Sequence, residues 1–329
     1  MKKKILCLVV FVTVLFLVTF MNRYDKVSDD LNVVKVAEVT HSAFYTPFYV
    51  AIEKGYFEEE GIKIDLILTS GANNVTAAVI SGDVHVGFCG PEATMYVYDN
   101  GEKDYLVSFA GLTKRDGQFI VSREKIDNFT LDSLKGKEVL AGRRGGMPIV
   151  NFYNALEKEN ITGVNVNDSV DFANLTSAFV GGTGDFVNLF EPNATKLEKM
   201  GYGYVYDSVG KYSGEVPYTA FNAKRSYVSA NKDIIEGFRK AIDKGLVYTF
   251  NNSAEVIAKD ILSQFPDTSL DDLTSIIDRY KRADSYLNSS FISEKSYDNL
   301  TDMLVKNKMI SERLPYSTLI VNEWCFKTS

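Results

Sequence analysis

The stretch GDVHVGFCGPEA, residues 82–93, decides the fold, because a second stretch further along the chain repeats its pattern. In GDFVNLFEPNA, residues 184–194, the same order of Gly-Asp, apolar run, proline and alanine recurs once one residue is skipped. Each copy predicts a strand that ends where a proline opens a helix, since proline has no N–H to lose in the first helical turn. Two such units in one chain favour a protein with two similar lobes.

The sequence around both copies alternates between strands and helices. Apolar residues at every second position predict strands at 33–39, 62–68 and 85–89 near the first copy, and at 137–141, 165–170 and 186–190 near the second. Helices are predicted between them, among them one from Pro47 to about Glu60, and the chain is mostly helical from residue 231. This alternation is typical of parallel sheets with helices on their faces.

Two of the predicted strands are interpreted as crossings between the lobes, one near 118–122 and one near 219–223. The expected organisation is an α/β fold in which residues 33–121 and 223–329 form the first lobe and residues 122–222 form the second. A cleft between two such lobes could close by a hinge motion.

The N-terminal residues 1–24 resemble an export segment. Three lysines, residues 2–4, precede an uninterrupted apolar run at 5–21, which is the order of a signal sequence. No small-residue cleavage pattern follows, and Cys7 lies too early to carry a lipid. We therefore favour an uncleaved membrane anchor over a cleaved signal peptide. Both alternatives place the body on the extracytoplasmic face of the cytoplasmic membrane, either anchored by this helix or released.

Composition excludes several function classes. The chain of 329 residues has 36 basic and 43 acidic side chains and a formal charge of −7, which argues against nucleic acid as a partner. It contains only two histidines, and it has no CxxC, HExxH, P-loop or GxGxxG pattern. The sequence therefore predicts neither a bound metal nor another cofactor.

Candidate ligand-binding residues lie where predicted strands end and helices begin. Ligands of open α/β sheets bind at the carboxyl ends of the strands, where helix N-termini offer unpaired N–H groups. In the loop after the first strand, His41 or Ser42 could donate hydrogen bonds and Phe44 or Tyr45 could stack on a planar ligand. The alternative is that the two aromatic rings only pack against the following helix.

Two glutamates occupy corresponding places in the repeat. Glu92 follows Gly90 and Pro91, and Glu191 precedes the proline of the second copy. Either carboxylate could accept hydrogen bonds from amino or ring N–H groups of a ligand. Each could instead only stabilise the N-terminus of its helix, where the helix dipole favours negative charge.

The second lobe also offers a turn that could bind an anion. Arg144, Gly145 and Gly146 precede a proline that opens a helix, and arginine can pair with a carboxylate, sulfonate or phosphate. The alternative is a solvent-exposed arginine pair with Arg143. Tyr218, close to the return crossing, is a further candidate for the cleft or for packing at the hinge.

These segments together resemble one protein family. Residues 41–61, HSAFYTPFYVAIEKGYFEEEG, resemble the first lobe of the nitrate/sulfonate/taurine and thiamine-pyrimidine solute-binding proteins of ABC transporters. The runs SGDVHVG (81–87) and GPEA (90–93) resemble their next segment. LKGKEV (134–139) and GRRGG (142–146) resemble the start of the second lobe, and residues 184–192 its ligand-side strand. The resemblance covers about residues 33–310.

The resemblance implies a type 2 periplasmic-binding-protein fold with two hinge strands and no catalysis. It also implies a small-molecule ligand that is delivered to an ABC permease and its ATPase. Two glutamates and stacking aromatics favour a planar nitrogen heterocycle, whereas Arg144 favours a small organic anion. An exported enzyme of the same fold and a surface sensor remain alternative functions.

Overall fold

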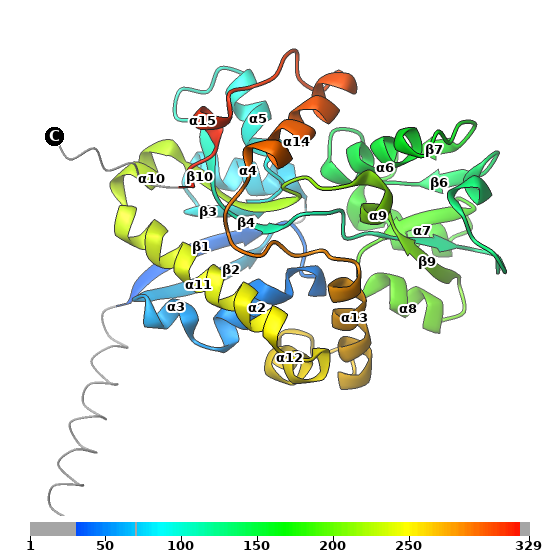
Figure 1. Ribbon diagram of the computed structural model, residues 1–329, viewed down its shortest axis with the longest axis horizontal. Coiled ribbons are helices and arrows are strands. Elements are labelled where there is room, and N and C mark those ends of the chain that lie inside the picture. Colours follow the sequence, from blue (N-terminus) through cyan, green and yellow to red (C-terminus); the bar gives the residue numbers. More distant parts are fainter. Residues whose placement is uncertain (1–30, 70, 323–329) are drawn as a thin grey trace, which may run out of the picture.

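The two copies of the repeated motif form equivalent strands in two separate sheets, seen side by side in Figure 1. The structure, a computed structural model, describes residues 31–69 and 71–322. The segment expected to be a signal peptide or anchor, residues 1–24, lies outside these ranges. The first copy becomes β3, Val86–Cys89, and the second becomes β8, Phe186–Leu189.

The first sheet has the strand order β2-β1-β3-β10-β4. Strand β1 pairs in parallel with β2 and β3, and β10 runs antiparallel to β3 and β4. Besides β3, its strands are β1 (Asn32–Glu38), β2 (Ile62–Leu68), β4 (Leu106–Thr113) and β10 (Thr219–Lys224).

The second sheet repeats this arrangement in the order β7-β6-β8-β5-β9. Strand β6 pairs in parallel with β7 and β8, and β5 runs antiparallel to β8 and β9. Besides β8, its strands are β5 (Phe119–Ser122), β6 (Glu138–Leu140), β7 (Asn165–Asn167) and β9 (Tyr204–Ser208). The matching strand orders confirm the two-lobed α/β fold predicted from the repeat.

The helices connect and cover these strands. In the first lobe they are η1 (Ala43–Tyr45), α2 (Thr46–Glu53), α3 (Tyr56–Glu59), α4 (Ala72–Ser81) and α5 (Glu92–Asp99). In the second lobe they are η2 (Leu131–Leu134), α6 (Met147–Lys158), η3 (Phe172–Asn174), α7 (Leu175–Val180), α8 (Asn193–Lys199) and α9 (Val209–Ser213). The single helix expected after Pro47 is divided, because Gly55 adopts a left-handed φ of 72° between α2 and α3.

The C-terminal part of the chain is helical, as the sequence predicted. It comprises α10 (Arg225–Ala230), α11 (Lys232–Asn251), α12 (Ala254–Ile261), η4 (Leu262–Gln264), α13 (Leu270–Arg282), α14 (Glu294–Lys306) and α15 (Tyr316–Leu319). Serines 253, 269 and 293 cap α12, α13 and α14, since each side chain accepts a hydrogen bond from a backbone N–H of the first turn. Helix α13 lies close to both lobes (Figure 1).

The chain crosses between the sheets at two neighbouring segments, 114–118 and 209–218. Strand β5 belongs to the second sheet and β10 to the first, so both crossings lie a few residues before the expected boundaries at 121/122 and 222/223. The crossings are hydrogen-bonded to each other, because the Val216 N–H donates to the Lys114 carbonyl at 2.9 Å and the Val209 N–H to the Gln118 carbonyl at 2.9 Å. They form a paired connection at the base of the interlobe space.

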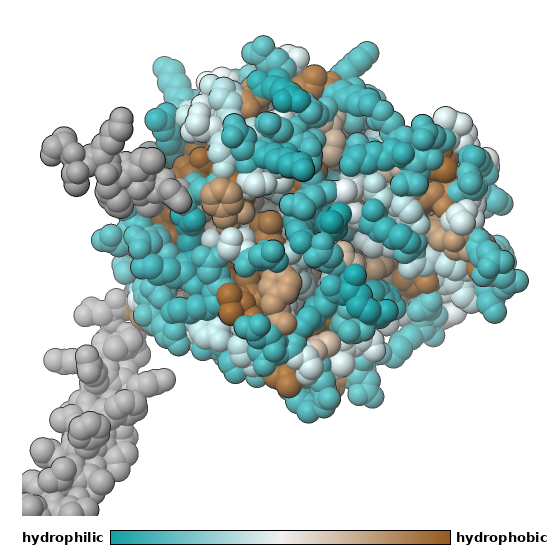
Figure 2. Space-filling model, viewed as in Figure 1, coloured by the Kyte–Doolittle hydropathy of each residue, from teal (hydrophilic) through white to brown (hydrophobic). Residues whose placement is uncertain are grey.

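The surface in the same view is mostly hydrophilic, with small and separate hydrophobic spots (Figure 2). Such scattered apolar residues are usual on a surface that contacts water. Within residues 31–69 and 71–322, no helix combines the length and apolar character needed to cross a membrane.

Candidate ligand-binding site

A cavity of about 980 Å³ lies between the lobes. It opens beyond the carboxyl ends of β1, β3 and β6, where parallel strands of an α/β sheet place their ligands. Its first-lobe wall includes Tyr45, Asn73, Asn74, Gly90, Glu92 and Tyr96; its second-lobe wall includes residues 142–148, Asp171, Phe172, Asn174 and Phe190; and Tyr218 and Thr219 from the return crossing complete it.

Glu92 places a buried carboxyl group in the wall of this cavity. The residue is 2% exposed, and its Oε2 atom has no hydrogen-bond partner among the described residues. Burial raises the pKa of this carboxyl to about 8, although the backbone N–H groups of Glu92, Met147 and Ala93 lower it in part. A buried carboxyl without a partner is unfavourable by itself, so a bound hydrogen-bond donor would be stabilised here.

Gly90 and Pro91 set the position of this carboxyl. Pro91 precedes α5 as its N-cap residue but does not line the cavity. At Gly90 an added Cβ would lie 1.9 Å from the Glu92 Oε2 and 2.5 Å from the Met147 Cγ. The carboxyl therefore folds back over the Gly90 backbone at a point where the two lobes touch.

The three aromatic candidates take different places. Tyr45 and Tyr218 line the cavity, and the buried hydroxyl of Tyr218 has no hydrogen-bond partner among the described residues. Phe44 does not line the cavity. Its ring lies 5.5 Å from that of Tyr45, 5.7 Å from Tyr218 and 5.2 Å from Tyr280. The packing interpretation thus holds for Phe44, which supports the tyrosines from behind.

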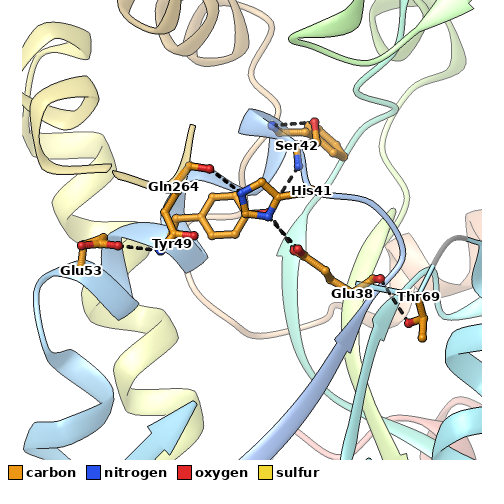
Figure 3. A network of polar contacts seen from close by, with 8 residues as sticks. Glu38, His41, Ser42, Tyr49, Glu53, Thr69 and Gln264 are labelled. Atoms are coloured by element: carbon orange, nitrogen blue, oxygen red, sulfur yellow. Dashed lines mark hydrogen bonds and ion pairs between the residues drawn. The ribbon is translucent and has the colours of Figure 1, made fainter. Parts of the chain in front are cut away.

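His41 belongs to a separate polar network beside the cleft (Figure 3). Its Nδ1 lies 2.7 Å from the Glu38 Oε1, and its Nε2 lies 2.8 Å from the Gln264 carbonyl oxygen. The Tyr49 hydroxyl donates to the other Glu38 oxygen at 2.8 Å. Burial alone would lower the pKa of His41, but Glu38 and the Gln264 carbonyl raise it above the usual 6.5. His41 therefore ties the loop after β1 to the C-terminal helices.

Ser42 and Glu191 meet in a smaller cavity of about 130 Å³, which His41 and Phe190 also line. The Ser42 hydroxyl donates to the Glu191 carbonyl oxygen at 2.6 Å and so connects the two lobes directly. Because this hydroxyl already has a protein partner, it is not free to bind a ligand in this conformation.

The Glu191 carboxylate, a candidate ligand contact, has protein partners in this structure. One oxygen accepts from the Thr195 N–H at 2.8 Å and the other from the Thr195 hydroxyl at 2.9 Å. The second oxygen also forms an ion pair with Arg279 of α13. Glu191 thus caps the start of α8 and joins it to the C-terminal helices, which is the structural alternative considered for this residue.

The turn before α6 lines the cleft as expected. Arg144, Gly145 and Gly146 all contribute to its wall, and the Tyr96 hydroxyl of the first lobe donates to the Gly145 carbonyl at 3.0 Å. The exposed Arg144 side chain forms no ion pair or hydrogen bond within residues 31–69 and 71–322. Arg143 lies 3.8 Å from Asp171. This wall is therefore positive at its solvent-exposed rim.

Several wall residues lacked any distinctive sequence signal. Asn73, Asn74 and Tyr96 of the first lobe, and Met147, Phe172 and Phe190 of the second, also line the cavity. Their positions after β2, β3, β6, β7 and β8 follow from the strand-end rule, but their residue types are common in helices and loops. In the part of the chain that the structure describes, no group of three or more His, Cys, Asp or Glu could hold a metal ion.

Comparisons with known proteins agree with this architecture. The chain is 40% identical over 301 residues to YtlA of Bacillus subtilis strain 168, whose name assigns it provisionally to the binding proteins, and the match covers 91% of this chain and 90% of that one. The fold is similar to the ligand-binding component of an ABC-type import system from Staphylococcus aureus, with a TM-score of 0.73 at 13% identity, covering 91% and 99% of the two chains. It is also similar to the alkanesulfonate-binding protein SsuA from Xanthomonas axonopodis pv. citri, with a TM-score of 0.69 at 14% identity and coverage of 88% and 98%.

The family assignment rests on the sequence match. The family model described as NMT1/THI5 like matches residues 42–256, which include both crossings and most of the cleft wall. This match and the Bacillus relative confirm the resemblance to solute-binding proteins inferred from the sequence motifs. The chain belongs to the NMT1/THI5-like family.

Proposed function

We propose that this protein is the extracytoplasmic solute-binding component of an ABC importer, which captures a small molecule between its lobes and delivers it to a permease and its ATPase. The cleft of about 980 Å³, with walls from both lobes and a paired crossing at its base, carries this proposal. A cleft of this size matches the usual range of small-molecule sites. Hinge closure around the ligand would give the permease a signal that the protein is loaded.

The ligand is a small planar molecule that presents amino or ring N–H groups to Glu92. Support comes from the contrast between the two walls: Glu92 is 2% exposed and Tyr45 and Tyr218 lie beside it, whereas Arg144 is exposed to solvent. A polar contact contributes more to the free energy of binding when it is shielded from water. The buried carboxyl of Glu92 should therefore contribute more to ligand affinity than the exposed guanidinium of Arg144. A small organic anion held by Arg144 is the alternative ligand class.

Binding without chemical conversion fits the groups around the cleft. The Ser42 hydroxyl is used in a hydrogen bond to the Glu191 carbonyl, and His41 lies between Glu38 and Gln264 rather than beside a nucleophile. Cys89 is buried, and burial raises the pKa of its thiol, so the reactive thiolate is disfavoured. None of these three side chains is therefore positioned as an activated nucleophile.

The same proposal assigns residues 1–24 to export and attachment. An apolar run behind three lysines would carry the body across the cytoplasmic membrane and keep it beside the permease, or would be removed after export. Either outcome places the cleft on the side of the membrane where the nutrient arrives.

A ligand screen with a closure measurement tests the proposal. We expect one class among aminopyrimidines, sulfonates and small inorganic anions to raise the melting temperature, with about 2.7 kcal/mol of stabilisation at a hundredfold excess over Kd. The same compound should reduce the radius of gyration in solution scattering and remain chemically unchanged. It should also increase ATP hydrolysis by the reconstituted permease. Turnover of the ligand would instead support an enzyme, and binding without stimulation of the permease a sensor.

A further inference from the structure

The wall of the cleft contains a buried carboxyl group with no positively charged partner among the described residues. Glu92 forms no ion pair within residues 31–69 and 71–322, and its Oε2 has no hydrogen-bond partner there. Arg143 and Arg144 line the same cleft, but both are exposed and neither pairs with Glu92. The cavity beside Glu92 is therefore open to a group that supplies the missing positive charge.

Among residues 31–69 and 71–322, the titratable groups that interact with this carboxyl are tyrosines and one cysteine, which are neutral when protonated. Tyr45 from η1, Cys89 from β3, Tyr96 from α5 and Tyr218 from the return crossing all interact electrostatically with Glu92. Helix α6 contributes only the backbone N–H of Met147. None of these groups can neutralise a carboxylate, because hydroxyl, thiol and amide groups carry no positive charge.

A second buried carboxyl lies behind Tyr218. Asp116, in the outward crossing, accepts a hydrogen bond from the Gln118 N–H at 2.7 Å, and its other carboxyl oxygen has no hydrogen-bond partner among the described residues. Burial raises the pKa of Asp116 to about 8, while the hydrogen bond from the Gln118 N–H, and the Tyr218 hydroxyl nearby but outside hydrogen-bond geometry, lower it in part. Burial thus favours the protonated form of both carboxyls at neutral pH, so Asp116 adds little negative charge beside Glu92.

We propose that the cleft selects ligands that carry a basic nitrogen, and that such a ligand binds as a cation while Glu92 gives up its proton to solvent. The exchange is balanced: the O–H bond of the carboxyl breaks, the proton leaves to water, and the carboxylate pairs with the cation that enters. This inference rests on the proposed function, because it names the ligand class of the same cleft. A neutral N–H donor could form a hydrogen bond to Glu92 without proton release. Proton release on binding therefore distinguishes a cationic ligand from a neutral one.

Matched pairs of planar compounds test the inference. The probes are benzamidine with benzamide, benzylamine with benzyl alcohol, and 4-aminopyridine with 4-hydroxypyridine, in which the first member is the cation at pH 7. We expect at least one cation to raise the melting temperature and its neutral partner to have no effect. Calorimetry in two buffers of different ionisation enthalpy should detect the release of about 0.9 proton per bound cation at pH 7, and Kd should weaken about tenfold from pH 7 to pH 6.

Two variants serve as controls. Glu92→Gln keeps the size of the side chain but has no proton to exchange, so it should lose at least tenfold in affinity for the cation and show no proton release. Because burial raises the pKa of Glu92 to about 8, replacing its carboxyl by a neutral amide should not lower the melting temperature at pH 7. Glu255→Gln, an exposed glutamate of α12 that pairs with Lys259, should leave both binding and proton release unchanged.

Specific results would overturn the inference. Equal binding of the cation and its neutral partner without proton release, or failure of all three cations to bind, would show that Glu92 does not select a basic nitrogen. The proposed function is decided separately, because the sulfonates and inorganic anions of the first screen can still bind and close the lobes. If none of the compounds in either screen binds, both the inference and the proposed function fail.

Discussion

The two glutamates of the repeated motif have opposite environments. Glu92, at the start of α5, is buried beside an open cavity with one oxygen unpartnered. Glu191, at the equivalent end of β8, has both oxygens occupied by Thr195 and Arg279. The motif places each carboxyl at a strand end, but a helix from elsewhere in the chain decides whether that carboxyl is available to a ligand. In the second lobe α13 supplies the cation, and in the first lobe no described element does.

The largest expected effect comes from removing the cation that Glu191 has and Glu92 lacks. Arg279→Met should lower the free energy of unfolding by about 3 kcal/mol, because it leaves the buried Glu191 carboxylate without its positively charged partner. This value is at the low end for a broken buried ion pair, because Arg279 is partly exposed. Urea unfolding of the variant measures this. Arg282→Met, on the same helix, is the matched control, because its pair with Asp278 is exposed and should contribute less than about 0.5 kcal/mol. Equal losses in the two variants would contradict the comparison.

The second effect is the dependence of stability on pH that Glu92 should cause. Its pKa of about 8 in the folded protein lies above the usual 4.5, so between these values the folded carboxyl keeps a proton that the unfolded chain has lost. Stability is then highest at low pH and falls as the pH rises, and the Glu92 contribution should fall by about 2 kcal/mol between pH 6 and pH 8.

Urea unfolding at several pH values checks this sign. Glu92→Gln should remove the contribution, so the variant should gain on the parent protein as the pH rises. Asp116→Asn should behave in the same direction, because the pKa of Asp116 is also raised to about 8 by burial. A difference between Glu92→Gln and the parent that stays constant from pH 6 to pH 8 would show that Glu92 is already ionised throughout this range.

Much of the fold could be predicted because its signals are local. Apolar periodicity predicted β2 at Ile62–Leu68 with the bounds that the structure has, and proline followed by an acidic residue marked the start of α5. The divided helix at Gly55 is the main local difference, and a left-handed glycine was its physical cause. The crossings lie a few residues before the expected lobe boundaries, because β5 and β10 each pair with the sheet that the chain is entering.

The site could be predicted only as far as backbone position determines it. The strand-end rule located Tyr45, Glu92 and the turn at 144–146 on the cleft wall. It did not determine the role of Glu191, whose partner Arg279 is 88 residues away, or that of His41, whose ring contacts Gln264 at a separation of 223 residues. Such pairings depend on how the C-terminal helices pack, and no spacing in the sequence encodes them.

A third prediction makes the same chemical change in the second copy of the motif. Glu191→Gln should lower the free energy of unfolding by about 1.5 kcal/mol, since the ion pair with Arg279 is lost while hydrogen bonds to Thr195 can persist. Affinity for a ligand should change by less than a factor of two, because the carboxylate does not face the larger cavity. Thermal melts and calorimetry on the same sample measure both quantities. A stable variant with weakened binding would return Glu191 to the ligand site.

The smallest expected effect concerns the opposite wall of the cleft. Arg144 is exposed and has no side-chain partner among the described residues, so its charge acts on a bound cation only through solvent. Arg144→Ala should therefore tighten the binding of benzamidine slightly, by about 0.5 kcal/mol or less, and high salt should abolish the difference. Arg143→Ala is the control, because the nearby Asp171 offsets part of its charge at 3.8 Å and its removal should change affinity even less. Calorimetric titration at low and high salt distinguishes these cases.

The opposite outcome would change the ligand class. If Arg144→Ala weakens the binding of a sulfonate by tenfold or more while benzamidine does not bind at all, the ligand is an anion. The guanidinium of Arg144 in the second lobe, rather than the carboxyl of Glu92 in the first, would then hold it.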